Sequence, residues 1–365
     1  MKMIDNLVIS TLPIKPQKVT NVGMLIGPTI SNVLKDAYQC RNVIGINTLN
    51  TYEKKDDQVD ILKKDLDNNY INYDKIVIDK DNDVVLLNKI SELVQKGLIK
   101  PKLKKKLICD CGRVDILEDS INNNAKLYHY DKDKIVCNSC NSVCKVFYEK
   151  VLCLELLNTI DDDVEICPTF LKKEMKGFSK TFKGSDLLIS KKRDTGYKIN
   201  VNNEGYNIDI DFIWSNFFNL FDEDNEVLIA SNHQLLIMYL MNYLAKLTSD
   251  KRICFLATPY IRTKKANDFD NYFLKDVDVY KKLFILYNLK WKQKDCLLSE
   301  SIIKFLDNTS ETKLNNLYKT ILTNADEYFI NSYGLAEQIN LFLERGTNQQ
   351  ENIKTMKRLY KERRL

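Results

Sequence analysis

Apolar residues along the chain fall into short continuous runs and into longer stretches with helical spacing. Taken in chain order, these stretches predict a strand, helix, strand, helix, strand, helix and strand, at 7–12, 23–39, 43–49, 84–95, 226–230, 232–247 and 253–257. Strands that alternate with helices of these lengths are typical of an α/β fold with a doubly wound parallel sheet. Ligands of such sheets bind at the carboxyl ends of the strands.

The stretch between the two halves of this pattern has a different character. It contains cysteine pairs, Asn-rich turns and a strand candidate at 145–152, which together predict an inserted domain. From about residue 270 onward apolar residues recur at helical spacing, and the chain ends in a basic amphipathic segment. The expected organisation is a first half of the sheet domain, an insertion, a second half and a helical domain, at 1–98, 99–205, 206–269 and 270–365.

Composition narrows the class of protein. Apolar residues make up 44% and charged residues 29% of the chain, as in an ordinary globular protein. No apolar run is long enough to cross a bilayer, since 235–243 is strongly apolar but short, so we expect a cytoplasmic protein with no membrane partner. The net charge of +5 is small, although cationic residues cluster at 100–106 and 354–364. Such clusters indicate either an RNA-facing surface or a solvated charged face, and nothing points to DNA.

Ten cysteines in a chain without a secretion signal favour metal binding or buried thiols over disulfides. Cys109 and Cys111 form one tight pair, and Cys137 and Cys140 form a second. Four thiolates from two turns suit a structural, tetrahedral Zn²⁺ site. Because one residue instead of the usual two separates the first pair, Cys144 is an alternate ligand.

His129 is a more remote candidate for that metal site. Three further cysteines lie in predicted strands, helices or their ends and are expected in the core, namely Cys40, Cys254 and Cys296.

Several short segments, in this order and spacing, resemble methionyl-tRNA synthetases of class I. They are Thr11-Leu12-Pro13, Val22-Gly23, Ser31-Asn32-Val33-Leu34, Tyr38-Gln39-Cys40-Arg41, Ile71-Asn72-Tyr73-Asp74, Lys96-Gly97-Leu98-Ile99, Leu228-Ile229-Ala230-Ser231-Asn232, Phe255 to Ala266 and Lys290 to Asn308. The resemblance covers roughly residues 5–325, and cysteinyl and class I lysyl synthetases share much of it.

The resemblance implies a Rossmann-like catalytic core, a connective insertion with zinc knuckles at the cysteine pairs, and a C-terminal α-helical domain that contacts tRNA. It implies ATP with Mg²⁺, an amino acid, and tRNA or aminoacyl-tRNA as ligands. Leu12, Pro13 and Met24 are then nucleotide-binding positions, as are Asn232 and His233, which match the place where the family contacts the ATP ribose.

The first signature of the family, His-x-Gly-His, stabilises charge on the ATP phosphates during adenylation. Asn21, Val22, Gly23 and Met24 occupy its positions here. Asn21 can donate a hydrogen bond and Gly23 keeps a close backbone approach, but Met24 has no donor. Both histidines of the chain lie more than a hundred residues away.

The second signature, Lys-Met-Ser-Lys-Ser, maps near 264–268, where Lys264 and Lys265 remain while Asn267 replaces the second lysine. The acidic residue that holds the substrate amino group maps into 47–53, with Glu53 as a candidate. Losing a positioned donor typically costs about two to four kcal/mol of barrier, so two such losses slow adenylation by roughly four orders of magnitude or more.

Three functions fit these observations. The first is a methionyl-type, class I synthetase-like protein with impaired or altered ATP-dependent amino-acid activation, in which Asn21, Gly23, Lys264 and Lys265 hold the catalytic positions. The second is a repurposed relative that binds an amino acid, a tRNA or a protein partner without forming adenylate. The third is a regulatory partner that uses the insertion and the basic tail as interaction surfaces.

Overall fold

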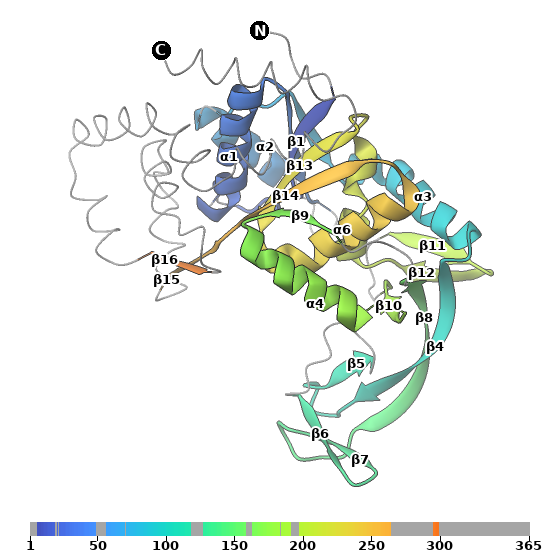
Figure 1. Ribbon diagram of the computed structural model, residues 1–365. Helices are drawn as coiled ribbons and strands as arrows, with labels where there is room; N and C mark the ends of the chain where they lie inside the picture. The colour runs from blue at the N-terminus through green and yellow to red at the C-terminus, as the bar shows by residue number, and fades with distance from the viewer. Residues whose placement is uncertain are drawn as a thin grey trace. The chain divides into compact units, whose positions relative to one another are not determined.

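The computed structural model describes ten stretches of the chain, at 6–18, 20, 22–48, 56–69, 71–117, 127–157, 163–182, 184–190, 197–263 and 295–298 (Figure 1). The described residues form two compact units. The first unit takes those within 1–82, 161–177 and 214–365, and the second takes those within 83–160 and 178–213.

A parallel sheet of six strands forms the centre of the first unit. Its strands follow the order β3 (Lys75–Ile78), β2 (Arg41–Ile46), β1 (Leu7–Thr11), β13 (Asn225–Ser231), β14 (Arg252–Thr258) and β9 (Glu165–Cys167). The order reverses direction between β1 and β13, which pair in parallel with Thr11 opposite Ile229. This is the topological switch point of a doubly wound, Rossmann-like sheet, and it confirms the predicted α/β fold.

Helices cover both faces of the sheet. Val59, Leu62 and Leu66 of α2 (Asp56–Asn68) pack with Leu25 of α1 (Val22–Tyr38) against Ile44 of β2. Side chains alternate along a strand, so the neighbouring Gly45 faces the other way, towards η3 (Phe217–Leu220), which contacts α6 (Leu235–Thr248). The strands are therefore buried on both faces, as their continuous apolar sequences predicted.

Gly45 is a glycine because two chain segments meet there. A Cβ atom at this position would lie 2.8 Å from the carbonyl oxygen of Thr11 and 3.1 Å from both Phe217 Cε1 and Pro13 Cα. The backbone N–H of Gly45 donates to the hydroxyl of Thr11 over 3.1 Å, and its carbonyl accepts from Ile14 over 2.9 Å. This close approach fixes the loop that follows β1 against the end of β2.

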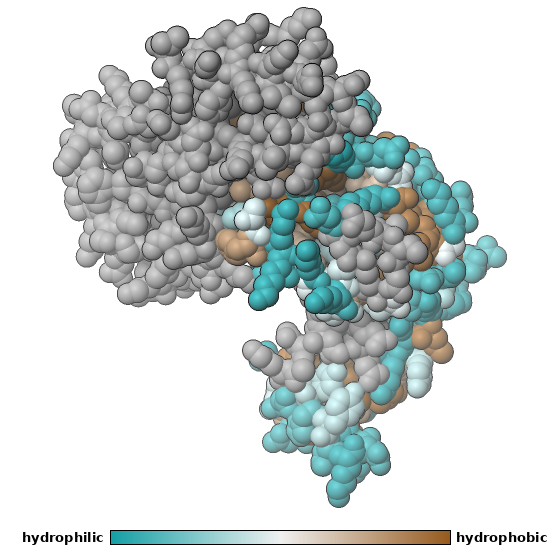
Figure 2. Space-filling model, in the orientation of Figure 1, coloured by the Kyte–Doolittle hydropathy of each residue, from teal (hydrophilic) through white to brown (hydrophobic). Residues whose placement is uncertain are grey.

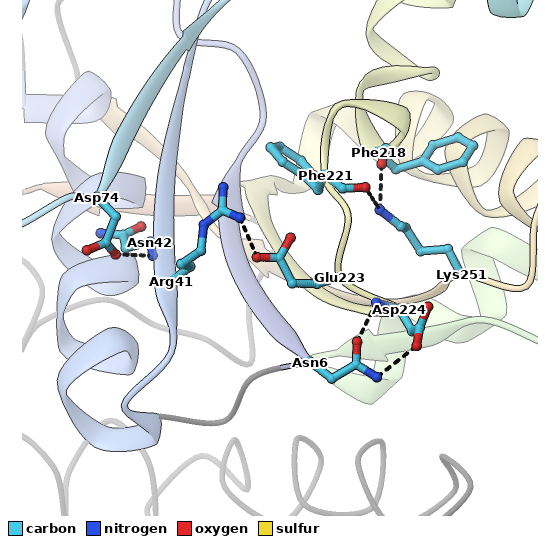
Figure 3. A network of polar contacts seen from close by, with 9 residues as sticks. All are labelled: Asn6, Arg41, Asn42, Asp74, Phe218, Phe221, Glu223, Asp224 and Lys251. Carbon is cyan, nitrogen blue, oxygen red and sulfur yellow. Dashed lines mark hydrogen bonds and ion pairs between the residues drawn. The ribbon is translucent and has the colours of Figure 1, made fainter. Parts of the chain in front are cut away.

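The amino ends of the strands are held by a polar network (Figure 3). Arg41 pairs with Glu223 at 2.7 Å, and Asn6 donates to Asp224 at 2.8 Å. Lys251 caps two backbone carbonyls, those of residues 218 and 221, over 2.8 and 2.6 Å. The network joins β1, β2, β13 and β14 at the edge opposite their carboxyl ends.

Glu226 is fully buried next to this network. Ser10 of β1 donates to one of its carboxylate oxygens, while the other oxygen has no hydrogen-bond partner. Burial raises the pKa of Glu226 to about 7, against the lowering effects of Ser10 and of the Lys251 charge. Glu226 is therefore protonated in the folded protein at mildly acidic pH.

The second unit contains a four-stranded sheet with a small knuckle at one end. The sheet order is β10 (Asp186–Leu188), β8 (Lys145–Glu155), β4 (Ile99–Ile108) and β5 (Asp115–Leu117). Two hairpins accompany it, β6 (Tyr128–Asp131) with β7 (Lys134–Cys137) and β11 (Lys198–Val201) with β12 (Glu204–Asn207). Helix α3 (Asp83–Gln95) contacts β4 and β11.

The remaining described elements are short, apart from α4. They are η1 (Lys80–Asn82), η2 (Thr169–Leu171), α4 (Lys172–Phe182), α5 (Ile210–Trp214), η4 (Asn232–Gln234), β15 (Tyr260–Thr263) and β16 (Asp295–Leu298). β15 and β16 pair in parallel. The rest of the expected helical domain at 270–365 lies outside the described residues.

The hydrophobic pattern of the sequence did not predict three elements of the first unit. β3 and β9 span only four and three residues, and α2 carries apolar residues at just a few positions among many charges. β9 lies within the expected insertion of 99–205, yet it pairs in parallel with β14 at the end of the central sheet. The boundaries at 98, 205 and 269 remain predictions.

Helix α6 contains the strongly apolar stretch 235–243 and lies in the core. Ten of its residues are buried, from Leu235 to Ala245. Within the described parts of the chain, no helix combines the length and the hydropathy needed to span a membrane.

Candidate functional site

Two turns present the paired cysteines at the end of the second unit. The first turn follows β4, where the N–H of Gly112 donates to the carbonyl of Cys109 over 2.9 Å and Cys109 N–H donates to Val114 over 2.8 Å. Gly112 has a φ of 73°, a left-handed conformation that favours glycine. The turn brings Cys109 and Cys111 onto one side.

The second turn follows β7 and is held by the same kind of backbone hydrogen bonds. Asn141 N–H donates to the carbonyl of Cys137 over 2.9 Å, and Asn141 adopts a φ of 57°, which asparagine tolerates better than most residues. Cys137 N–H donates to Ser142 over 3.0 Å and closes the turn around Cys140. Each pair thus depends on a local backbone hydrogen-bond pattern.

The four sulfur atoms of these turns lie within 4.8 Å of one another. Cys109 Sγ is 3.3 Å from Cys111 Sγ and 3.3 Å from Cys140 Sγ, and Cys111 Sγ is 3.7 Å from Cys137 Sγ. A tetrahedral Zn²⁺ with bonds of about 2.3 Å places its sulfur ligands about 3.8 Å apart. The four cysteines can therefore hold a metal ion, and we call them the cysteine knuckle.

The electrostatics of the knuckle are compatible with a bound cation. The backbone N–H of Ser142 and its hydroxyl lower the pKa of Cys140 to about 6. Although the backbone N–H of Cys111 lowers the pKa of Cys109, the neighbouring thiols of Cys111 and Cys140 raise it more, to about 12. Four thiolates cannot coexist at these distances unless a positive charge offsets their repulsion.

The alternate candidates lie outside this group of four. Cys144 is buried beside it, its N–H donates to Ile135 over 2.7 Å, and burial raises the pKa of its thiol. His129 directs Nδ1 at the side-chain oxygen of Asn138 over 2.6 Å. Nine cysteines in the described stretches are free thiols, with Cys40 and Cys254 buried as expected. The Cys296 side chain lies outside the described residues.

The positions of the first loop that the sequence predicts to bind a nucleotide lie at the carboxyl end of β1. Leu12 and Pro13 are buried, and Leu12 N–H donates to the carbonyl of Ile229 on β13 over 2.9 Å. They therefore line the switch point through their backbone, while their side chains belong to the core. The carboxyl edge, as we call the ends of β1, β2, β3, β13 and β14, is where a doubly wound sheet binds ligands.

The first signature positions begin helix α1. Gly23 is exposed in the first turn, as a close backbone approach to a ligand requires. Met24 is partly buried and packs against the apolar cluster of α1, α2 and β2. Asn21 lies outside the described residues.

Asn232 and His233 begin η4, directly after β13. Asn232 is buried, whereas His233 is exposed and places Nδ1 3.3 Å from the hydroxyl of Ser231. Its ring meets the edge of Tyr260 after β14 with centroids 4.2 Å apart. A capping box between Ser231 and Gln234 holds the turn in place. The structure thus brings His233 and Tyr260 together at the carboxyl edge.

Asp79 is a buried carboxylate at the same edge that sequence reasoning missed. It follows β3 and accepts hydrogen bonds from the N–H and hydroxyl of Thr48 at 2.8 and 3.0 Å and from Lys80 N–H at 2.8 Å. Burial raises its pKa, against these hydrogen bonds and one from Trp214. The signal was an acidic residue directly after Ile76-Val77-Ile78, a strand too short to predict.

Three other predicted positions lie outside the described residues, namely Glu53, Lys264 and Lys265.

No family model and no curated protein sequence matches this chain. Solved structures do match. Mycobacterium tuberculosis methionyl-tRNA synthetase in complex with methionyl-adenylate aligns with a TM-score of 0.61 and 12% identity, over 89% of this chain and 72% of the synthetase. A second structure of that enzyme bound by methionyl-adenylate aligns with a TM-score of 0.58 and 12% identity, over 88% of this chain and 72% of the synthetase. Its apo form aligns with a TM-score of 0.58 and 13% identity, over 90% of this chain and 71% of the synthetase. The chain therefore has the class I synthetase fold of these methionyl-tRNA synthetases.

Proposed function

We propose that this chain is a methionyl-type, class I synthetase-like protein whose ATP-dependent amino-acid activation is impaired or altered. The fold supports the ancestry, since the six-stranded sheet has its switch point between β1 and β13 and aligns with methionyl-tRNA synthetases. The methionyl-tRNA synthetase of Mycobacterium tuberculosis binds methionyl-adenylate. An amino acid, ATP with Mg²⁺ and tRNA are accordingly the ligands to test.

The packing of Met24 carries the proposal. Its side chain lies partly buried against the core cluster of α1, α2 and β2, so at this position the start of α1 offers packing instead of a hydrogen-bond donor. A donor aimed at developing charge is typically worth about two to four kcal/mol of barrier. If Met24 occupies the second histidine position of the signature, as we propose, its packing against the core takes the place of that donor.

A second candidate function is binding without adenylate formation. It is supported by polar groups that remain at the carboxyl edge, where buried Asp79 fixes Thr48 and where His233 and Tyr260 meet. These groups can orient an amino acid or an aminoacyl group without activating ATP. In this case the ligand is an amino acid, a tRNA or a protein partner.

We assign Zn²⁺ as the metal of the cysteine knuckle, with a structural role. Four cysteine thiolates close all coordination positions, which leaves no open site for a water or a substrate. The apolar cluster around the knuckle is small and contains three of the unit's own cysteines, Cys109, Cys137 and Cys144. A bound metal therefore supplies stability that so small a core does not.

Pyrophosphate exchange with a panel of amino acids tests the first function. We expect exchange with methionine that is slower by roughly four orders of magnitude than that of an ordinary synthetase. Calorimetry with ATP and Mg²⁺ on the same protein provides the second readout. Silence in both measurements would overturn the first function and leave the second.

Direct binding tests the second function. Calorimetry with each amino acid, and band-shift assays with total tRNA, are expected to reveal a ligand that binds without ATP. Asp79→Asn is the informative variant, because it keeps the shape of a side chain that holds the edge through Thr48. Absence of affinity for every amino acid and for tRNA would contradict this function.

A further inference from the structure

Two of the four cysteines of the knuckle are open to solvent. Among the nine cysteines of the described stretches, Cys111 and Cys140 are exposed and the other seven are buried. Figure 2 shows mostly hydrophilic residues on the hairpin β6–β7, which leads into Cys140, as expected where water reaches the surface. Zinc holds its cysteine ligands as thiolates, and an accessible thiolate is the reactive form of cysteine. A small oxidant in solution therefore meets the thiolates of this chain first at these two positions.

Each exposed sulfur atom lies against a buried one on the opposite turn. Cys140 Sγ is 3.3 Å from Cys109 Sγ, and Cys111 Sγ is 3.7 Å from Cys137 Sγ. Cys109 and Cys137 are both buried. An oxidised cysteine becomes a disulfide when a neighbouring thiolate attacks its sulfur. The shorter distance makes Cys140 with Cys109 the pair best placed for this reaction.

The knuckle has little besides a metal to hold it together. Seven buried residues form its apolar cluster, and three of them are cysteines, Cys109, Cys137 and Cys144. A disulfide between two of the four ligands leaves only two thiolates for the metal. Since metal binding and folding are coupled in so small a core, loss of the metal releases the two turns.

We propose that Cys140 is a modification site for hydroperoxides, and that its disulfide with Cys109 expels zinc from the knuckle. This inference rests on the zinc site of the proposed function. It goes beyond that site by giving the structural metal a reversible, redox-controlled occupancy.

The reaction proceeds in two balanced steps. The Cys140 thiolate attacks an oxygen of the hydroperoxide and breaks the O–O bond, which forms a sulfenic acid and releases hydroxide or an alkoxide. The Cys109 thiolate then attacks the Cys140 sulfur, forms the S–S bond and expels hydroxide. The two thiolates lose two electrons to the peroxide, solvent protonates the leaving groups, and Zn²⁺ departs without a change of oxidation state.

The test treats the full zinc-loaded chain with hydrogen peroxide and follows released zinc with a chromogenic chelator. We expect one zinc ion to leave per chain, and peptide mass spectrometry to find one disulfide, between Cys109 and Cys140. Limited proteolysis should cut the oxidised knuckle and spare the zinc-loaded one. Dithiothreitol with added zinc should restore the metal and the resistance to protease, because a disulfide is reduced by thiols whereas higher oxidation states are not.

The informative variant is Cys140→His, because histidine replaces cysteine as a ligand in many zinc sites but forms no disulfide. It should load zinc and release it at least about tenfold more slowly under peroxide, since the accessible thiolate of the reactive pair is gone. Cys144→Ala is the matched control, because it removes a buried thiol of the same cluster that lies outside the four ligands. It should release zinc as fast as the parent.

The outcomes separate the inference from the metal site beneath it. A parent chain that carries no zinc before treatment refutes the metal site, and the modification site with it. Zinc that stays bound through treatment of the parent, or a disulfide that leaves out Cys140, refutes the modification site alone. Release from Cys140→His at the parent's rate, or slower release from Cys144→Ala, likewise overturns the assignment to Cys140. If Cys140→His fails to load zinc, the disulfide mapped in the parent decides.

Discussion

The cysteine knuckle and the carboxyl edge of the central sheet differ in how far apart in the sequence their candidate functional residues lie. The knuckle takes its four sulfur atoms from two turns between Cys109 and Cys140, and all four are present within 4.8 Å. The predicted ATP positions are spread from Leu12 to Lys265, on separate loops. Under the proposed zinc site, loss of one of these cysteines would remove the metal and, with it, the local fold of the knuckle.

The carboxyl edge can change residue by residue, because its stability does not come from the catalytic groups. Burial of β1, β2, β13 and β14 between two helical layers holds the sheet in place. Met24 illustrates this under the proposed function, since it packs against the core cluster at a position that we match to a signature histidine of the family. The proposed local metal site and the proposed distributed nucleotide site would therefore lose function in different ways.

The largest effect is expected from removing knuckle ligands. Cys109→Ser combined with Cys137→Ser should abolish metal binding and expose the knuckle to proteases, because structural zinc contributes folding free energy directly. Metal analysis by mass spectrometry and limited proteolysis measure both effects. Cys144→Ala is the matched control, since Cys144 lies outside the group of four sulfurs, and it should retain the zinc. Zinc loss in the control instead would make Cys144 a ligand.

The next prediction concerns Glu226 and tests whether its burial in the sheet makes the stability of the protein depend on pH. Its pKa rises from 4.5 to about 7 on folding, which corresponds to about 3 kcal/mol. Below pH 4.5 the carboxyl is protonated in both states and costs nothing. As pH rises from 4.5 to about 7 the unfolded state loses the proton first, so stability falls, and above pH 7 the cost is constant.

Glu226→Gln should therefore be more stable than the parent at pH 8 and about as stable at pH 4. Urea unfolding at a series of pH values measures the difference in unfolding free energy. Ser10 remains able to donate a hydrogen bond to the amide oxygen of glutamine. An unchanged pH profile would mean that Glu226 is ionised and compensated in the folded protein.

A smaller effect is expected from glycines that differ in the space around them. Gly45→Ala should lower the unfolding free energy by about 1–3 kcal/mol, because its Cβ would lie 2.8 Å from the Thr11 carbonyl oxygen. Gly177→Ala is the control, since it lies within α4 with no atom within 4 Å of its Cβ position. It should raise stability by about 0.5–1 kcal/mol. Equal effects of the two changes would refute the close approach at β1 and β2.

The smallest effect is expected from restoring a single catalytic group. Met24→His should change pyrophosphate exchange by less than about tenfold, because the side chain at this position packs against the core cluster and is not held as a donor to the ATP phosphates. It should also cost about 1 kcal/mol of stability, since the side chain packs against the core cluster. Exchange kinetics and thermal unfolding of one protein sample give both numbers. A hundredfold gain in rate would show that a histidine at this position can still act as a donor, contrary to the packing argument.

Much of the fold was predictable, because strands buried on both faces are continuous apolar runs. The runs at 7–12 and 253–257 correspond to β1 and β14 within a residue at each end. β3 and β9 were not predictable, since three or four residues carry no periodicity, and neither was α2 with its sparse apolar positions. Such segments adopt their structure because they pair or pack with segments that are distant in the sequence.

The candidate site was predictable where it is local. Four cysteines in two tight pairs pointed to one another through spacing alone, and their sulfurs do meet. The approach of Tyr260 to His233 depends on how β13 and β14 pair, and the burial of Asp79 depends on Thr48 and Trp214. Contacts between segments far apart in sequence leave no local signal.

Pyrophosphate exchange with the full panel of amino acids is the most direct test of the central claim, that a synthetase fold persists here with its activation chemistry impaired or altered. The zinc-loaded chain should exchange with methionine at a rate roughly four orders of magnitude below that of Mycobacterium tuberculosis methionyl-tRNA synthetase measured in parallel. Exchange at a rate comparable to that enzyme would contradict the account.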